Sequence, residues 1–183
     1  MDPIERIERA TAVGAEKVKG VAGNQLSEPT PCTEFDVGAL LNHVIGGLAM
    51  LGTAARGEKG AMPEGDQFGS DPGADYERLR GELLTALAVD GVLDRDWEMP
   101  FATMPGAVMA NIAFMEHLTH AWDVAKATGQ DTTLPADLVA ECLQVVTPMD
   151  AMLRSSGVCG PAVKVADDVS EQDRLIAFMG RQP

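Results

Sequence analysis

A carboxylate and an imidazole four residues apart, Glu116 and His120, are the side chains of this chain best spaced to act together. On an α-helix, positions i and i+4 lie on one face, where both side chains can reach the same ligand. At about 100° per residue, Ile112, Thr119 and Asp123 fall on that face too. One face would therefore carry a carboxylate, an imidazole, a hydroxyl and a second carboxylate. We predict that this face holds a divalent metal ion.

The opposite face of the same helix is apolar, which is typical of core packing. Asp123 lies one turn beyond His120 on the polar face, so we expect it to orient a ligand or a substrate group rather than to bind the ion. The side chains predicted to pack in the core are Phe114, Met115, Leu118, Trp122 and Ala125.

The third metal ligand is expected to be His43, on another helix. The chain has three histidines. On its predicted helix, His43 lies in line with the small residues Ala39 and Gly47, along which a second helix can approach closely. Two imidazoles and one carboxylate leave one coordination position open, as in catalytic rather than structural zinc sites. His117 lies about 100° around the helix from Glu116, and we leave it out of the site.

Other interpretations of these residues stay open at this point. A Glu-x-x-x-His pair is common in surface ion pairs, and a single histidine on an apolar helix is often a core residue with its hydrogen bonds satisfied. Cys32, between prolines and a polar turn, is either a reactive thiol or a packed side chain.

The charge balance excludes several classes of partner. With 28 acidic and 14 basic residues the net charge is −14, so we expect neither nucleic acid nor a membrane surface as a partner. Three cysteines, an odd number without a CxxC pair, are typical of a reducing compartment. The acidic N-terminus lacks the pattern of a signal peptide, and we expect a cytoplasmic protein.

Hydrophobic periodicity predicts an all-α chain. Residues 37–55 contain no charged side chain and could by length span a membrane. Their glycines, His43 and Asn42, with acidic flanks, favour the central helix of a bundle instead. We predict no strands, although 162–165 could be extended, and we expect residues 90–105 to cover one end of the bundle. The predicted helices are 3–21, 37–55, 74–89, 106–128, 135–153 with an interruption at Pro148, and 171–179.

Several motifs together resemble a known family. They are Thr30-Pro31-Cys32, Pro100–Gly106, Glu116–Gln130 with its Trp-Asp and Ala-Thr-Gly, and the tail from Gly160 to Leu175. The sequence resembles the actinobacterial branch of the DinB-like superfamily, and within it the N-terminal domain of mycothiol-dependent maleylpyruvate isomerase. This resemblance implies one domain over 1–183: a DinB-like four-helix bundle with a long crossover connection and an extra C-terminal helical segment. It also implies a metal on His43, Glu116 and His120.

Two functions follow as hypotheses from the residues and the resemblance. One is a metal-dependent S-transferase or isomerase that acts with mycothiol on a small electrophile, with Zn²⁺ as the first expectation and Ni²⁺ as the alternative. The other is a non-catalytic metal-binding or interaction module, with the chain as a monomer or homodimer. Against direct transfer of the isomerase activity, the chain has no room for the isomerase's additional C-terminal domain. Phe35 also stands where the family often has a tryptophan.

Overall fold

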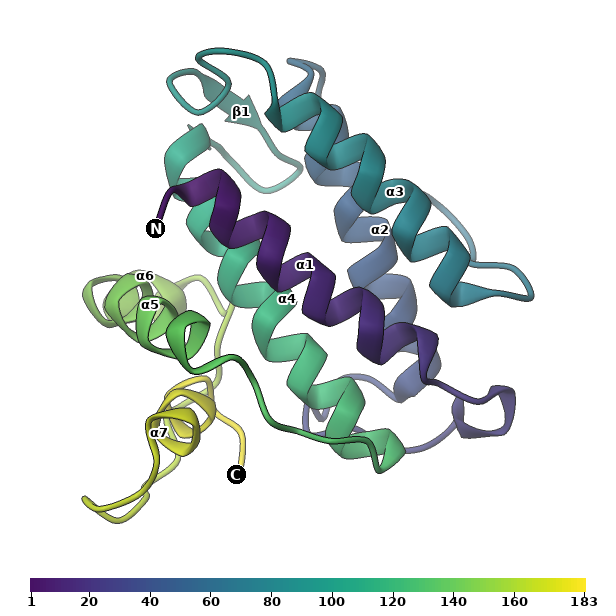
Figure 1. Cartoon of the computed structure of the whole chain (residues 1–183). Coiled ribbons are helices and arrows are strands. Elements are labelled where there is room, and N and C mark those ends of the chain that lie inside the picture. Colours follow the sequence, from purple (N-terminus) through teal and green to yellow (C-terminus); the bar gives the residue numbers. More distant parts are fainter.

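Four long helices form the core of the structure (Figure 1). The computed structural model describes all residues, 1–183. The four helices are α1 (Pro3–Lys19), α2 (Val37–Ala55), α3 (Pro72–Leu87) and α4 (Gly106–Thr128). The predicted helical fold class is therefore confirmed.

The ends of these helices are set by local sequence. The Asp2 side chain accepts a hydrogen bond from the Ile4 amide, and Asp36 caps α2 in the same way. Asp71 caps α3 and Pro72 occupies its first turn, so α3 begins two residues before the predicted start. Gly129, at φ 71°, ends α4 in the left-handed conformation that glycine adopts most readily.

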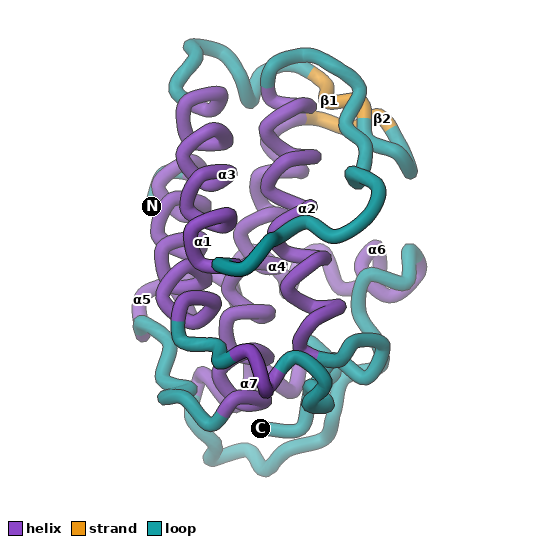
Figure 2. Tube along the Cα trace, turned by 90° about the vertical axis from the view of Figure 1, so that its right-hand side faces the viewer, coloured by secondary structure: helices purple, strands orange, loops and turns teal.

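The four helices pack in a ring in which α4 lies between α1 and α2, and α3 closes the ring between them. Helix α2 ends beside the 96–105 segment, where the Gly60 amide donates to the Glu98 carbonyl, 2.8 Å away. Helix α3 starts at the other end of the bundle, where Gly73 lies against Lys19. The connection 56–71 therefore runs the length of the bundle, across the face of α2 (Figure 2). This is the predicted long crossover, and it makes α2 and α3 parallel.

A short hairpin closes one end of the bundle and corrects the prediction of no strands. Strands β1 (Asp96–Glu98) and β2 (Thr103–Pro105) pair antiparallel, with Trp97 opposite Met104. Trp97 is buried, and its indole N–H donates to the Val92 carbonyl at 3.0 Å. The segment therefore covers the bundle end as expected, but three-residue strands are too short to show an alternating pattern.

The C-terminal third adds short helices beside α4 (Figure 1). They are α5 (Ala136–Val146), a 3₁₀ turn (Thr147–Met149), α6 (Asp150–Ser155) and α7 (Glu171–Phe178). The predicted interruption at Pro148 is confirmed. Residues 162–165 form no strand; the Val163 amide donates instead to the Ala177 carbonyl of α7, 2.9 Å away.

Helix α2 is long and apolar enough to cross a membrane by length and composition alone. In this structure 56% of its most apolar 18-residue stretch is buried inside the bundle. A buried core helix passes the same test of composition, so the apolarity of α2 is accounted for by its packing against α3 and α4.

Candidate metal centre

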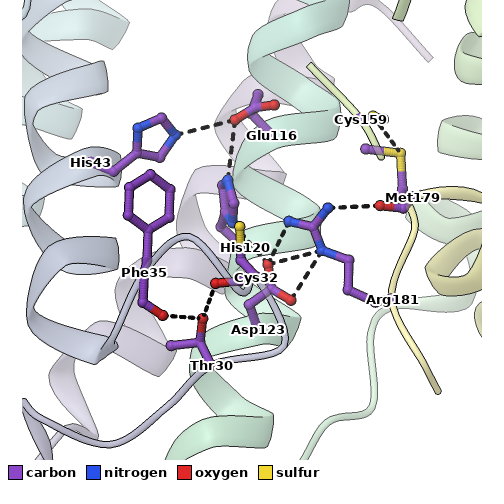
Figure 3. Close-up of polar contacts among 10 residues, drawn as sticks. All are labelled: Thr30, Cys32, Phe35, His43, Glu116, His120, Asp123, Cys159, Met179 and Arg181. Atoms are coloured by element: carbon purple, nitrogen blue, oxygen red, sulfur yellow. Dashed lines mark hydrogen bonds and ion pairs between the residues drawn. The ribbon is translucent and has the colours of Figure 1, made fainter. Parts of the chain in front are cut away.

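The three predicted ligands come together between α2 and α4 (Figure 3). One carboxylate oxygen of Glu116 lies 3.4 Å from Nε2 of His43 and 3.2 Å from Nε2 of His120. One donor atom from each residue lies within 4.8 Å of the other two. Helix α4 supplies two of these donors by its i, i+4 spacing, and α2 supplies the third where Gly47 leaves open space one turn away.

This donor set suits a divalent transition metal. Ligands at about 2.0–2.1 Å from a tetrahedral Zn²⁺ are separated from each other by about 3.4 Å. The two Glu116–imidazole distances match that separation, and two nitrogens with one oxygen are ligands that Zn²⁺ prefers. A tetrahedral ion held here would have one position left for a molecule from solution.

Asp123 orients one of the imidazoles. Its carboxylate lies 2.9 Å from Nδ1 of His120 and is completely buried. A hydrogen bond from Nδ1–H to Asp123 leaves the lone pair of Nε2 directed toward Glu116, which is the arrangement that metal-binding histidines usually have. The sequence predicted that Asp123 orients a ligand, and the structure places its carboxylate on His120.

In the metal-free cluster, the surrounding charges keep His120 protonated at the position where a cation would bind. Burial alone would lower the pKa of His120, but its hydrogen bonds to Asp123 and Glu116 raise that pKa to about 9. Burial opposes ionisation of Glu116, yet the hydrogen bonds from His120 and His43 lower its pKa well below the usual range. The cluster is therefore an imidazolium–carboxylate pair whose positive charge a metal ion would replace.

The C-terminal tail binds Asp123 from the other side, a contact that was not predicted. Arg181 is buried and donates to the Asp123 carboxylate, with Nη2 2.9 Å from Oδ2. Its other terminal nitrogen donates to the Met179 carbonyl at 2.7 Å. Fifty-eight positions separate Arg181 from Asp123, and no spacing rule connects residues that far apart.

Cys32 lies at the same place but in a less suitable donor set. Its thiol, with His120 and Asp123, forms a second group of donors within 4.8 Å. Asp123 is already bound to His120 and Arg181, however, and burial raises the pKa of the Cys32 thiol, which disfavours the thiolate. The structure therefore favours a packed thiol over a reactive one.

Phe35 and a turn shape the rim of the site. The Phe35 ring stacks on the His43 imidazole, with 5.1 Å between centroids and 23° between planes. The Thr30 hydroxyl lies 2.9 Å from the Cys32 carbonyl and 2.8 Å from the Phe35 carbonyl, and so draws the loop together before α2. The aromatic ring in this loop thus restricts the rotation of one candidate ligand.

A cavity of about 550 Å³ opens above the three donors. This volume is within the range of small-molecule sites. The tail, from Gly157 to Gly160 and from Met179 to Arg181, forms one of its walls. His117 also lines the cavity, although it lies outside the candidate donor group. Thr119 does not line the cavity, and its buried hydroxyl has no hydrogen-bond partner. Methionine and phenylalanine side chains make much of the remaining surface: Phe35, Met50, Met62, Phe101, Met109 and Met179.

The fold and site define a helical-bundle protein with a candidate metal centre at the base of an interhelical cavity. The chain belongs to the family described as mycothiol maleylpyruvate isomerase N-terminal domain, which matches residues 7–125. It is therefore a mycothiol-related, DinB-like domain, as the sequence motifs indicated. The family match ends before the tail that contributes Arg181.

Two curated relatives extend the similarity over the whole chain. Both are from Mycobacterium tuberculosis: uncharacterized protein Rv0738 of strain H37Rv and uncharacterized protein MT0763 of strain CDC 1551. Each is 31% identical to this chain over 189 residues, covering 99% of this chain and 98% of the relative. No solved structure matches the chain.

Proposed function

We propose that this protein is a divalent-metal-dependent S-transferase or isomerase that uses mycothiol as its thiol and acts on a small electrophile in the cytoplasm. His43, Glu116 and His120 hold the ion, with Zn²⁺ as the first candidate and Ni²⁺ as the alternative. Asp123 orients His120, and Arg181 holds Asp123. An ion held by these three residues would supply a binding position for the thiol on the cavity side of the donors.

The observation that carries this proposal is the convergence of three donor atoms from two helices at the base of a small-molecule cavity. Glu116 stands 3.4 and 3.2 Å from the two imidazoles, the spacing that one tetrahedral ion requires. Membership of the mycothiol maleylpyruvate isomerase family supports the choice of thiol.

The chemistry explains why a cation would be useful here. A free thiol has a pKa near 8.5 and is mostly protonated at neutral pH, whereas a bound divalent cation lowers the pKa of a thiol placed on it. In the transferase reaction the thiol loses its proton to solvent, its sulfur lone pair forms a bond to an electrophilic carbon, and the leaving group departs with its electron pair. The apolar cavity wall keeps water from competing with the thiol.

The first test is metal content. Elemental analysis of the purified protein should find about one divalent ion per chain, and His120→Ala should lose most of it because a donor is gone. His117→Ala is the matched control: it removes a neighbouring imidazole on the same helix that lies outside the donor group, so it should keep the ion. Equal metal content in the two variants would contradict the site.

The second test separates an enzyme from a binding module. Metal-loaded protein, mycothiol and a panel of alkylating electrophiles should yield conjugates faster than the same protein stripped with a chelator. A protein that binds the ion, yet neither forms conjugates nor shifts its melting temperature with mycothiol, would instead be the non-catalytic module.

A further inference from the structure

His117 presents a second polar group to the cavity, separate from the three metal donors. The residue is buried and lines the cavity. Its Nδ1 lies 3.1 Å from the Tyr76 hydroxyl of α3, which is its one hydrogen-bond partner in the protein. Nε2 has no hydrogen-bond partner in the protein, and this atom is not sealed from solvent. In a residue this buried, the remaining access for Nε2 is through the cavity that the side chain lines.

Tyr76 determines which nitrogen of His117 carries the proton. The Tyr76 side chain is buried, and its hydroxyl has one hydrogen-bond partner, Nδ1 of His117. A buried hydroxyl donates whenever an acceptor is available, because an unpaired donor costs free energy. Nδ1 therefore accepts, and the imidazole hydrogen is on Nε2, facing the cavity.

Three helices hold this pair in position. The Tyr76 and His117 rings meet edge to face, with their centroids 6.0 Å apart and their planes at 87°. On α1, a Cβ at Gly14 would collide with the Tyr76 hydroxyl, so the absence of a side chain there makes room for the pair. Such tight packing from α1, α3 and α4 fixes the direction of the Nε2–H bond.

The cavity surface around this donor is apolar. Apart from the three metal donors, His117 is the one polar side chain that α2 and α4 present to the cavity, and the other polar lining residues, Thr33, Glu34 and Arg181 among them, come from the loop before α2 and from the tail. The other lining residues of these two helices are Val44, Gly47, Met50, Leu51, Met109, Ile112 and Ala113.

We propose that the Nε2–H of His117 binds a carbonyl or similar neutral oxygen of the electrophile, and that the part of the electrophile lying against α2 and α4 is apolar. That the ligand is an electrophile rests on the proposed function, but binding of an oxygen at His117 does not require turnover. On the wall formed by α2 and α4, one fixed donor favours a molecule with a matching acceptor at that point, because any other molecule would leave the donor unpaired. A hydrogen bond to a carbonyl also draws electron density from the adjacent carbon, which a thiolate attacks.

Two unreactive probes of similar size, acetophenone and ethylbenzene, test the selectivity. Purified metal-loaded protein should bind acetophenone roughly three- to tenfold more tightly than ethylbenzene, the usual net effect of one hydrogen bond. In His117→Leu this preference should fall to about one, while His117→Gln, which keeps an N–H in a similar place, should retain part of it. Equal binding of both probes to the unaltered protein, failure to bind either, or an unchanged preference in His117→Leu would overturn the proposal.

Nuclear magnetic resonance of protein labelled with ¹⁵N-histidine tests the donor directly, because the chain has three histidines. His117 should show an unprotonated Nδ1 and a protonated Nε2 whose signal shifts with acetophenone but not with ethylbenzene. Tyr76→Phe should release the preference for this tautomer, which keeps the test decisive if His117→Leu does not fold. A hydrogen on Nδ1 of His117 in the unaltered protein would overturn the proposal.

The two proposals fail separately. Absence of conjugates from the metal-loaded protein would remove the proposed enzyme and leave the probe selectivity intact. Conjugation with mycothiol by a protein that binds both probes equally would remove the His117 site alone.

Discussion

At the scale of single residues, the candidate centre is a chain of paired charges that runs from the tail to α2. Arg181 binds Asp123, Asp123 binds His120, and Glu116 lies between His120 and His43. In the metal-free protein this arrangement stabilises the protonated form of His120, because two carboxylates contact its ring. A cation bound at Nε2 would displace that proton, so metal affinity and pH are linked.

The linkage gives the metal-free protein a pH-dependent stability. The pKa of His120 is raised from 6.5 to about 9 in the folded chain, so its contribution is complete below pH 6.5 and is lost as the pH rises through about 9. We expect the free energy of unfolding, measured by urea titration with a chelator present, to fall by on the order of 1–3 kcal/mol between these limits.

Two variants and the loaded protein serve as controls for that slope. His120→Gln should flatten it. His117→Gln should keep it, since burial lowers the pKa of His117 to about 3 and that residue does not titrate in this window. With metal bound, the free energy of unfolding should no longer fall over this pH range. The same fall in His120→Gln would show that His120 is not the group responsible.

The contacts that the sequence could and could not predict differ in one physical respect. The grouping of Glu116, His120 and Asp123 was predictable because helix geometry fixes which positions share a face, whatever the rest of the chain does. Arg181 was missed because its contact depends on the path of the whole C-terminal tail. His117 lies outside the candidate donor group, and its orientation depends on Tyr76 of α3, which no periodicity of α4 reveals.

At the scale of elements, α4 is positioned by the hairpin that precedes it. The Gly106 amide donates to the Arg95 carbonyl at 2.9 Å, and the Ala107 amide donates to the Leu93 carbonyl at 3.2 Å. A Cβ at Gly106 would lie 2.7 Å from the Trp97 indole nitrogen and 3.0 Å from the backbone at residues 93 and 95. The close approach of β1 to the start of α4 therefore requires glycine.

A matched pair of glycine variants tests this contact. Gly106→Ala should lower the free energy of unfolding by roughly 1–3 kcal/mol, because the methyl group overpacks a site walled by backbone. Gly81→Ala, on the exposed side of α3 with open space around it, should raise it by up to about 1 kcal/mol through helix propensity. Both values come from urea denaturation, and similar effects from the two substitutions would count against the packing described.

Elements were predictable where they are long. All six segments predicted as helices contain helix, including the short one at 171–179, and Pro148 interrupts the fifth segment. The hairpin was missed because each strand has three residues, with Trp97 the one buried side chain between two exposed ones in β1. Three residues are too few to show the alternation of buried and exposed side chains by which a strand is recognised.

At the scale of the whole molecule, the order of helices around the bundle creates the site. In a bundle arranged in sequence order, α2 would lie diagonally across from α4, and His43 would not reach Glu116. The long connection 56–71 instead places α2 next to α4 and parallel to α3. This topology followed from the family resemblance, since the residue pattern alone does not specify how four helices are ordered.

The most direct test of the central claim is X-ray absorption at the zinc edge, with and without mycothiol. The account predicts two imidazole nitrogens and oxygen donors at about 2.0–2.1 Å in the zinc-loaded protein, and a new sulfur at about 2.3 Å once mycothiol is added. A spectrum without histidine ligands, a sulfur present before mycothiol is added, or no sulfur after its addition would contradict it.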